Sequence, residues 1–198
     1  MAERGKGKSD SRDRRIEERR RRILDVAREY SESEGWAAVT TRRLADAIGY
    51  TQPVLYGHFP GGKSEIMRTV ALEGFEELAR MCRASAGGAG GRPVLQAVST
   101  AYLDFAERNP ALYEAMFRLP IDAHFAADDS EVELQAGFSA LADAIGDGGD
   151  GTATEVLWGA LHGLADLARS GRVRPEQRER RITEIATRFG EGDGRGRG

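Results

Sequence analysis

Apolar residues recur three and four positions apart through most of the chain, which is the spacing of one face of an α-helix. A first helix is expected to end near Glu34, with Gly35 at its C-cap. Glycine-rich stretches and prolines separate the later helical segments, which are 64–85, 92–109, 111–119, 130–145, 152–170 and 175–189. No segment has a convincing strand period, so the predicted fold class is all-α.

Two short helices joined by a tight turn are predicted between Thr40 and Ser64. Thr40 is a good N-cap for the first helix, its apolar face is Leu44, Ala45 and Ile48, and Gly49 ends it. Thr51 can cap the second helix, Gln52–His58, whose first turn tolerates Pro53 because N–H groups there have no intrahelical partner.

The second helix is well below the roughly 12 to 15 residues that an isolated helix needs in water, so it must pack against other elements. Leu55 and Phe59 would form its buried face. The remaining face presents a mixture suited to bases, thymine methyl groups and phosphates, namely Gln52, Pro53, Val54, Tyr56 and Gly57. This pattern predicts a helix-turn-helix whose recognition helix is Gln52–His58.

From Ile23 to Ile66 the chain resembles the DNA-binding domain of the TetR (tetracycline-repressor-like) transcriptional regulators. The matching residues, almost all at the family spacing, are Ile23, Ala27, Gly35, Thr40, Thr41, Leu44, Ala45, Gly49, Thr51, Leu55, Tyr56, His58, Phe59 and Lys63. The resemblance implies that DNA is contacted by Thr41, Arg42, Gln52, Pro53, Tyr56, His58 and Lys63, and the exposed-face pattern adds Val54. In one departure from the family, Gly57 replaces a side chain that is usually bulky.

The resemblance also implies a C-terminal domain that dimerises and binds a small effector. The last two helices would pair with those of a second subunit through Leu157, Leu161, Ile182, Ile185 and Phe189. The candidate effector pocket consists of residues that are first of all a core, namely Tyr102, Phe105, Tyr113, Met116, Phe117, Phe138, Trp158 and His162. Trp158, His162 and Gly163 also resemble the Trp-x-x-x-His-Gly signature of one TetR C-terminal subfamily, although Trp158 and His162 equally fit a buried core pair.

Charge divides the chain unevenly. Residues 1–68 hold 15 Lys and Arg against 11 Asp and Glu, a net of +4, whereas the rest has a net of −7. The basic end is therefore the helix-turn-helix end, which supports the motif. Cys82 is the only cysteine, so an intrachain disulfide and a cysteine-cluster zinc site are excluded. No stretch of about 18 apolar residues and no signal peptide are found, so a cytoplasmic protein without a membrane span is expected.

These features predict four regions. Residues 1–13 form a disordered basic arm that either tracks DNA phosphates or has no role. Residues 14–63 form the helix-turn-helix domain, residues 64–189 a helical ligand-binding and dimerisation domain, and residues 190–198 a disordered tail.

Two enzyme-like or metal-binding interpretations compete with a DNA-binding one. Residues 57–64 fit G-x-x-x-x-G-K-[ST], the phosphate-binding P-loop, but neither a preceding buried strand nor a second strand ending in an acid is apparent. His124, near Asp122, Asp128 and Asp129, fits no standard metal site and is more simply part of an acidic surface loop. We therefore expect neither an enzyme nor a cofactor or metal.

The function expected from the sequence is a homodimeric regulator that binds double-stranded DNA. The most specific form of this expectation is a repressor that a small, largely apolar effector releases from a palindromic operator. A helix-turn-helix protein without an effector is the alternative, and a P-loop nucleotide-binding protein is a more distant one.

Overall fold

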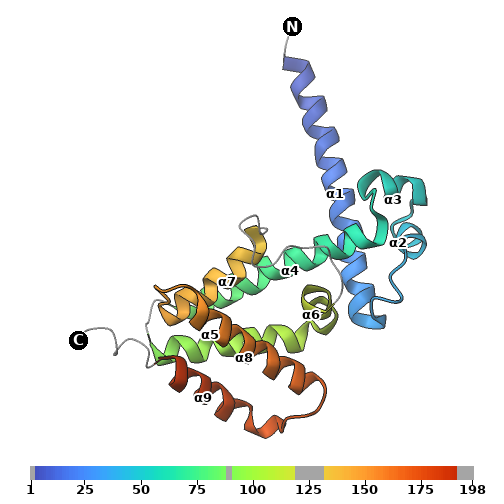
Figure 1. Cartoon of the computed structure of the whole chain (residues 1–198). Coiled ribbons are helices and arrows are strands. Elements are labelled where there is room, and N and C mark those ends of the chain that lie inside the picture. Colours follow the sequence, from blue (N-terminus) through green and yellow to red (C-terminus); the bar gives the residue numbers. More distant parts are fainter. Residues whose placement is uncertain (1–2, 88–90, 119–131, 191–198) are drawn as a thin grey trace. The chain divides into compact units, whose positions relative to one another are not determined.

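The computed structural model describes residues 3–87, 91–118 and 132–190, and all regular secondary structure in those ranges is helical (Figure 1). The predicted all-α class is confirmed. The helices are α1 (Glu3–Glu34), α2 (Thr41–Ile48), α3 (Gln52–His58), α4 (Gly62–Ala86), α5 (Arg92–Arg108), α6 (Pro110–Phe117), α7 (Val132–Ile145), α8 (Thr152–Arg169) and α9 (Arg178–Gly190), with a 3-10 turn at Pro175–Gln177 before α9. None of the helices in the described ranges is long and apolar enough to span a membrane.

The N-terminal end differs from the prediction, because α1 already begins at Glu3 where a disordered arm was expected. Residues 3–22 are rich in Arg, Lys and Glu and contain no proline, and these residue types are good helix formers. Low hydrophobicity therefore did not prevent a helix here. Of the predicted tail 190–198, Gly190 is the last residue of α9 and the remainder lies outside the described residues, as does the predicted loop 121–129.

The chain forms two compact units. We call residues 1–71 with 111–122 the N-terminal unit, and residues 72–110 with 123–198 the C-terminal unit. The predicted boundary between residues 63 and 64 falls at the start of α4, whereas the two units divide within α4 and most of α6 belongs to the N-terminal unit.

In the N-terminal unit, α1 contacts both α2 and α3, and α2 contacts α3. The core between them is apolar and fully enclosed, with Ala27, Val39, Leu44, Leu55 and Phe59 all at 0% exposure. The α1 helix also holds the start of α6, because the Glu32 carboxylate accepts hydrogen bonds from the backbone N–H groups of Ala111 (3.0 Å) and Leu112 (2.9 Å). A carboxylate at a helix N-terminus satisfies donors that have no intrahelical partner.

In the C-terminal unit, α5 lies against α9, α8 and α7, and α7 also packs on α8. The interface between α5 and α9 includes an ion pair of 2.5 Å between Arg178 and Asp104. Buried Leu95 and Val98 belong to α5, and the partner helices also contribute enclosed side chains, Leu157 and Leu161 from α8 and Ile182 and Ile185 from α9.

Candidate nucleic-acid interface

The turn between α2 and α3 is built by local sequence. Thr40 has an extended backbone and its hydroxyl oxygen accepts the N–H of Arg43 at 3.2 Å, which starts α2. Gly49 adopts a left-handed conformation with φ 74°, and the following N–H of Tyr50 bonds the Ala45 carbonyl at 2.9 Å. This left-handed glycine reverses the chain and brings α3 across α2.

The short helix α3 has one buried and one exposed face. Leu55 on α3 and Phe59 at its C-cap are both 0% exposed, which docks the helix in the N-terminal unit. On the opposite side, Val54 is 36% and Tyr56 is 45% exposed. The other exposed residues of α3 are Gln52, Pro53 and Gly57. Large apolar and aromatic side chains left in water on a two-turn helix indicate a contact surface.

Arg20 of α1 supports the end of α3 and was missed by the sequence analysis. Its guanidinium donates a hydrogen bond to the His58 carbonyl at 2.8 Å and lies 4.1 Å from the centre of the Phe59 ring. A cation at a helix C-terminus satisfies a carbonyl that has no intrahelical partner. Burial and, after it, the charges of Arg19 and Arg20 lower the pKa of His58, so this imidazole is neutral near pH 7.

Arg42 and Arg43 are adjacent in sequence but differ in environment. Arg42 is exposed, whereas Arg43 pairs with Glu34 at 2.7 Å and lies 4.6 Å from the centre of the Tyr30 ring. The hydrogen bond from Arg43 lowers the pKa of the Glu34 carboxyl. Arg43 therefore joins α2 to α1, and Arg42 and half-buried Thr41 remain as the polar residues of the predicted interface on α2.

Lys63, predicted to contact DNA, is half-buried and its ammonium donates to the Trp36 carbonyl at 2.5 Å. The same region contradicts the P-loop interpretation, because Gly57 and His58 belong to a helix and not to the end of a strand. Within the described residues no cluster of three or more His, Cys, Asp or Glu could hold a metal ion, and His124 lies outside them.

Two family models match most of the chain between them. Residues 23–70 match "Bacterial regulatory proteins, tetR family", and residues 95–189 match "Tetracyclin repressor-like, C-terminal domain". The chain belongs to the TetR family. It is therefore a DNA-binding transcriptional regulator and not an enzyme, as predicted.

A curated protein and two solved structures resemble the chain along most of its length. An uncharacterized HTH-type transcriptional regulator of Mycobacterium tuberculosis is 25% identical over 180 residues, covering 87% of this chain and 80% of the relative. A protein of unknown function from Rhodococcus sp. RHA1 has a TM-score of 0.68 at 21% identity, covering 88% of this chain and 94% of its own. A bacterial regulatory protein in the TetR family from Rhodococcus RHA1 has a TM-score of 0.61 at 19% identity, with 87% and 96% covered. The two structures support the TetR fold.

The structure distributes the predicted effector residues of this TetR protein over both compact units. Tyr102 and Phe105 are buried in α5 of the C-terminal unit, while Tyr113 and Met116 are buried in α6 of the N-terminal unit. The half-buried residues of the same set are Phe117, Phe138, Trp158 and His162. None of the eight lines the cavity of about 240 Å³ in the C-terminal unit, between α5, α8 and the start of α9.

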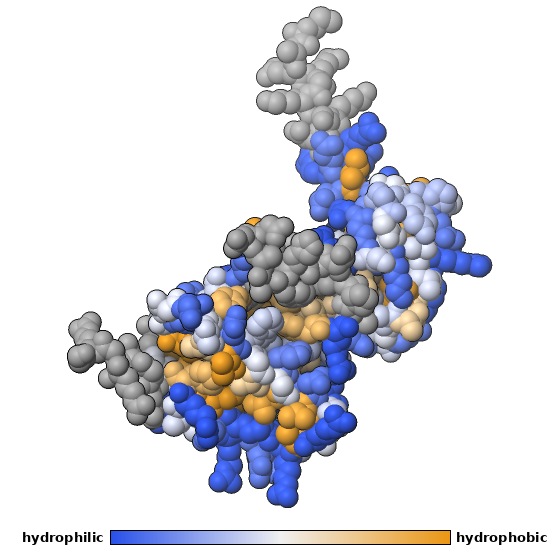
Figure 2. All heavy atoms as spheres, in the orientation of Figure 1, coloured by the Kyte–Doolittle hydropathy of each residue, from blue (hydrophilic) through white to orange (hydrophobic). Residues whose placement is uncertain are grey.

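The predicted dimerisation residues lie on the inner faces of α8 and α9. Leu157 and Leu161 are 0% exposed, Ile182 is 2% and Ile185 is 6% exposed within a single chain, and Phe189 is half-buried. The four buried side chains pack in their own unit and are not available to a second subunit. Another face of α8 is open to solvent, and Figure 2 shows apolar surface along it. This outer stripe of α8 consists of Val156, Gly159, Ala160, Gly163 and Leu167.

Proposed function

We propose that the protein is a homodimeric repressor that binds a palindromic operator through α3 and is released from it by a small effector. The observation that carries the proposal is the division of α3 into a fully buried face and an exposed one bearing Gln52, Val54 and Tyr56. A regulator of bacterial genes acts on cytoplasmic DNA, so the proposal places the protein in the cytoplasm.

Each exposed side chain of α3 matches a feature of the major groove. The Gln52 amide can donate to and accept from adenine, and the Val54 methyl groups suit the methyl group of thymine. Tyr56 supplies a hydroxyl and an aromatic face at the centre of the helix. Thr41 and Arg42, at the start of α2, are suited to phosphates beside the groove, which fix register but do not read sequence.

A second subunit is proposed to pack on the outer stripe of α8. TetR-family regulators dimerise, and the stripe combines two exposed apolar side chains, Val156 at 58% and Leu167 at 39%, with small residues between them. An added Cβ at Gly159 or Gly163 would meet no atom of the described part of the chain within 4 Å, so the stripe leaves open space for a partner helix. Two-fold pairing would present two α3 helices to half-sites about 34–36 Å apart, or a multiple of this.

The effector part of the proposal depends on α4. This helix begins at Gly62 in the N-terminal unit and continues without interruption into the C-terminal unit. An effector that favours the DNA-incompetent position of α4 by about 1–3 kcal/mol would weaken operator binding by about 5- to 150-fold. By linkage, operator would weaken effector binding by the same factor. A helix-turn-helix regulator without an effector remains the alternative.

Selection of bound sequences from random double-stranded DNA by the full chain tests the proposal. We expect an enriched inverted repeat, because a two-fold dimer reads the same half-site twice. The same selection is repeated with Tyr56→Ala and with Val132→Ala, a matched control at an exposed position of α7. Loss of enrichment with Tyr56→Ala alone would show that DNA recognition, and not the fold, was changed. An enriched sequence without two-fold symmetry would contradict the dimeric operator, and no enrichment by the wild-type chain would contradict specific binding.

A further inference from the structure

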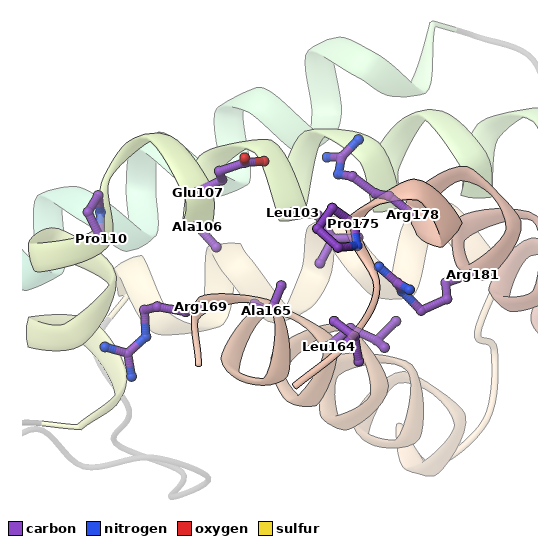
Figure 3. A pocket seen from close by; sticks show the side chains of 12 residues that line it. Leu103, Ala106, Glu107, Pro110, Leu164, Ala165, Arg169, Pro175, Arg178 and Arg181 are labelled. Atoms are coloured by element: carbon purple, nitrogen blue, oxygen red, sulfur yellow. The ribbon is translucent and has the colours of Figure 1, made fainter. Parts of the chain in front are cut away.

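The described cavity of about 240 Å³ lies entirely within the C-terminal unit. Its apolar walls come from Leu103 and Ala106 of α5, Leu164 and Ala165 of α8, and Val173 in the connection to α9 (Figure 3). Ligand sites usually combine such apolar walls with a few polar groups that orient the ligand.

The polar part of this cavity is mainly arginine. Arg169, Arg178 and Arg181 line it, against a single acid, Glu107. In the view of Figure 3, Arg169 lies on the Pro110 side, and Arg178 and Arg181 lie on the Pro175 side. The segment 169–181 that supplies the arginines holds six of them and two glutamates, although residues 69–198 carry a net charge of −7. The basic character is therefore local to the rim of the cavity.

The three arginines differ in their partners. Arg169 pairs with Asp166 at 3.1 Å, and Arg178 pairs with Asp104 at 2.5 Å and with Glu179 at 3.4 Å. The guanidinium of Arg181 donates instead to a neutral backbone acceptor, the Arg174 carbonyl, at 2.9 Å. A guanidinium has five N–H donors in a planar fork that matches a carboxylate bidentately. Arg181 thus retains both charge and donors for an anion.

We propose that this cavity binds a small carboxylate with an apolar body, its carboxylate held by Arg181 and its body against Leu103, Leu164 and Val173. The volume is below the roughly 300–1,000 Å³ of pockets for drug-sized ligands, which favours a small occupant. The further step, that this cavity is the effector site, rests on the proposed function. In that case the effector is an anion bound in this cavity, and not a largely apolar molecule bound in the predicted aromatic pocket.

Calorimetric titration of the full chain with octanoate tests the site directly. Octanoate is expected to bind, while octanamide, which lacks the charge, and acetate, which lacks the apolar body, should each bind at least about tenfold more weakly. Arg181→Gln should weaken octanoate binding by a similar factor. Arg180→Gln is the matched control, because it removes the same charge from the neighbouring, exposed position that does not line the cavity.

A cavity-filling variant tests whether loss of octanoate binding is due to the cavity and not to unfolding of the protein. Ala168 lines the cavity and is exposed, so Ala168→Phe should abolish octanoate binding while circular dichroism stays unchanged. Equal affinity for octanoate and octanamide, or wild-type affinity after Arg181→Gln, overturns the proposal. It is also overturned if octanoate does not bind, and dissociation of a dimer by Ala168→Phe would then show that a second copy of the chain covers the cavity.

Operator release is measured separately, so that the site and the proposed function can fail independently. Arg181-dependent binding of octanoate supports the site whether or not the protein binds a selected operator. If operator is bound and octanoate leaves its affinity unchanged, the site stands as a carboxylate site and its assignment to the effector is overturned. If octanoate lowers the operator affinity of the wild type and of Arg180→Gln but not that of Arg181→Gln, the result supports both the carboxylate site and its role as the effector site.

Discussion

At the scale of single residues, Gly57 is a residue that no contact among the described residues explains. It is the penultimate residue of α3 and has a helical backbone, and a Cβ added there would meet none of the described atoms within 4 Å. Glycine in a helix interior is less stable than alanine by roughly 0.5–1 kcal/mol. Because the chain itself would accommodate a side chain, close approach of DNA is the physical reason that we assign to this glycine.

Gly57→Ala should therefore stabilise the protein by about 0.5–1 kcal/mol and yet weaken operator binding. Thermal unfolding and DNA titration measure the two effects separately. Gly137→Ala on α7 is the matched control, since its Cβ would meet Phe75 at an ordinary 3.9 Å, and it should leave DNA binding unchanged. Unaltered operator affinity in Gly57→Ala would show that DNA does not approach α3 at this position.

Gln52 and Tyr56 are the residues that we expect to read bases. Replacing either with alanine should cost about 1–3 kcal/mol, or about 5- to 150-fold in Kd, for the selected operator, with little change on unrelated DNA. Since both side chains are exposed, thermal stability should stay close to wild type. Fluorescence anisotropy with operator and scrambled DNA provides the comparison, and wild-type affinity in both variants would exclude α3 as the recognition helix.

At the scale of elements, the start of α8 depends on Asp147, which lies near the start of the α7–α8 connection. One carboxylate oxygen accepts the N–H and hydroxyl of Thr154 at 3.1 and 2.6 Å, and the other accepts the N–H of Gly149 at 3.0 Å. The hydrogen bond from the Thr154 hydroxyl, and then the one from the Gly149 N–H, lower the pKa of Asp147 below its ordinary value of 3.8. Thr154 is itself 0% exposed, so this carboxylate satisfies a buried hydroxyl.

The lowered pKa gives a definite sign to the pH dependence. The unfolded chain binds a proton more readily at Asp147 than the folded chain, so this residue contributes stability above the ordinary pKa of 3.8 and loses it as pH falls through the lower folded value. Asp147→Asn should destabilise the protein near neutral pH. As the pH falls, the variant should lose less further stability than the wild type, because it has no carboxylate to protonate at this position. Urea unfolding across this range measures the effect, with exposed Asp143→Asn as the control. Parallel acid profiles for wild type and Asp147→Asn would contradict it.

At the scale of the whole molecule, the two faces of α8 have different roles. The inner face, including Leu157 and Leu161, is enclosed by the helices of its own unit, whereas the outer stripe is exposed in a single chain. Of these two faces of α8, the outer stripe is the one that a second subunit can reach. The apolar surface that remains in water on one chain is the surface that association would bury.

Val156→Glu should convert the dimer into folded monomers and weaken operator binding, because a charge would be placed in the interface without disturbing the core. Ile185→Glu should instead unfold the C-terminal unit, since that side chain is 6% exposed. Sedimentation and circular dichroism distinguish the two results. Val132→Glu, which changes an exposed residue on α7, is the control, and a Val156→Glu protein that still sediments as a dimer would remove the outer stripe from consideration.

The sequence by itself was sufficient for α2 and α3 because the signals that begin and end these helices are local. Thr40 caps α2 through its own hydroxyl, and Gly49 adopts the left-handed turn that ends it. Gln52–His58 was predicted with the bounds that the structure shows, but Thr51, the predicted cap of α3, has an extended backbone and makes no side-chain capping hydrogen bond. The exposed face of α3 could also be predicted from the sequence, because a helix of two turns with one apolar side must bury that side. The pattern missed Arg20, because its bond to the His58 carbonyl joins positions 38 residues apart.

Tertiary structure decided how the C-terminal helices use their apolar surface. The apolar arc of α8 is wider than one face, so periodicity could not distinguish the part packed on α5 from the part left in water, and the buried Leu157 and Leu161 were predicted at a dimer interface. Likewise, Arg181 acquired its place beside Leu103 in a cavity only when α9 packed on α5. Helical spacing determines which residues share a face, but the partner of that face depends on elements far away in the sequence.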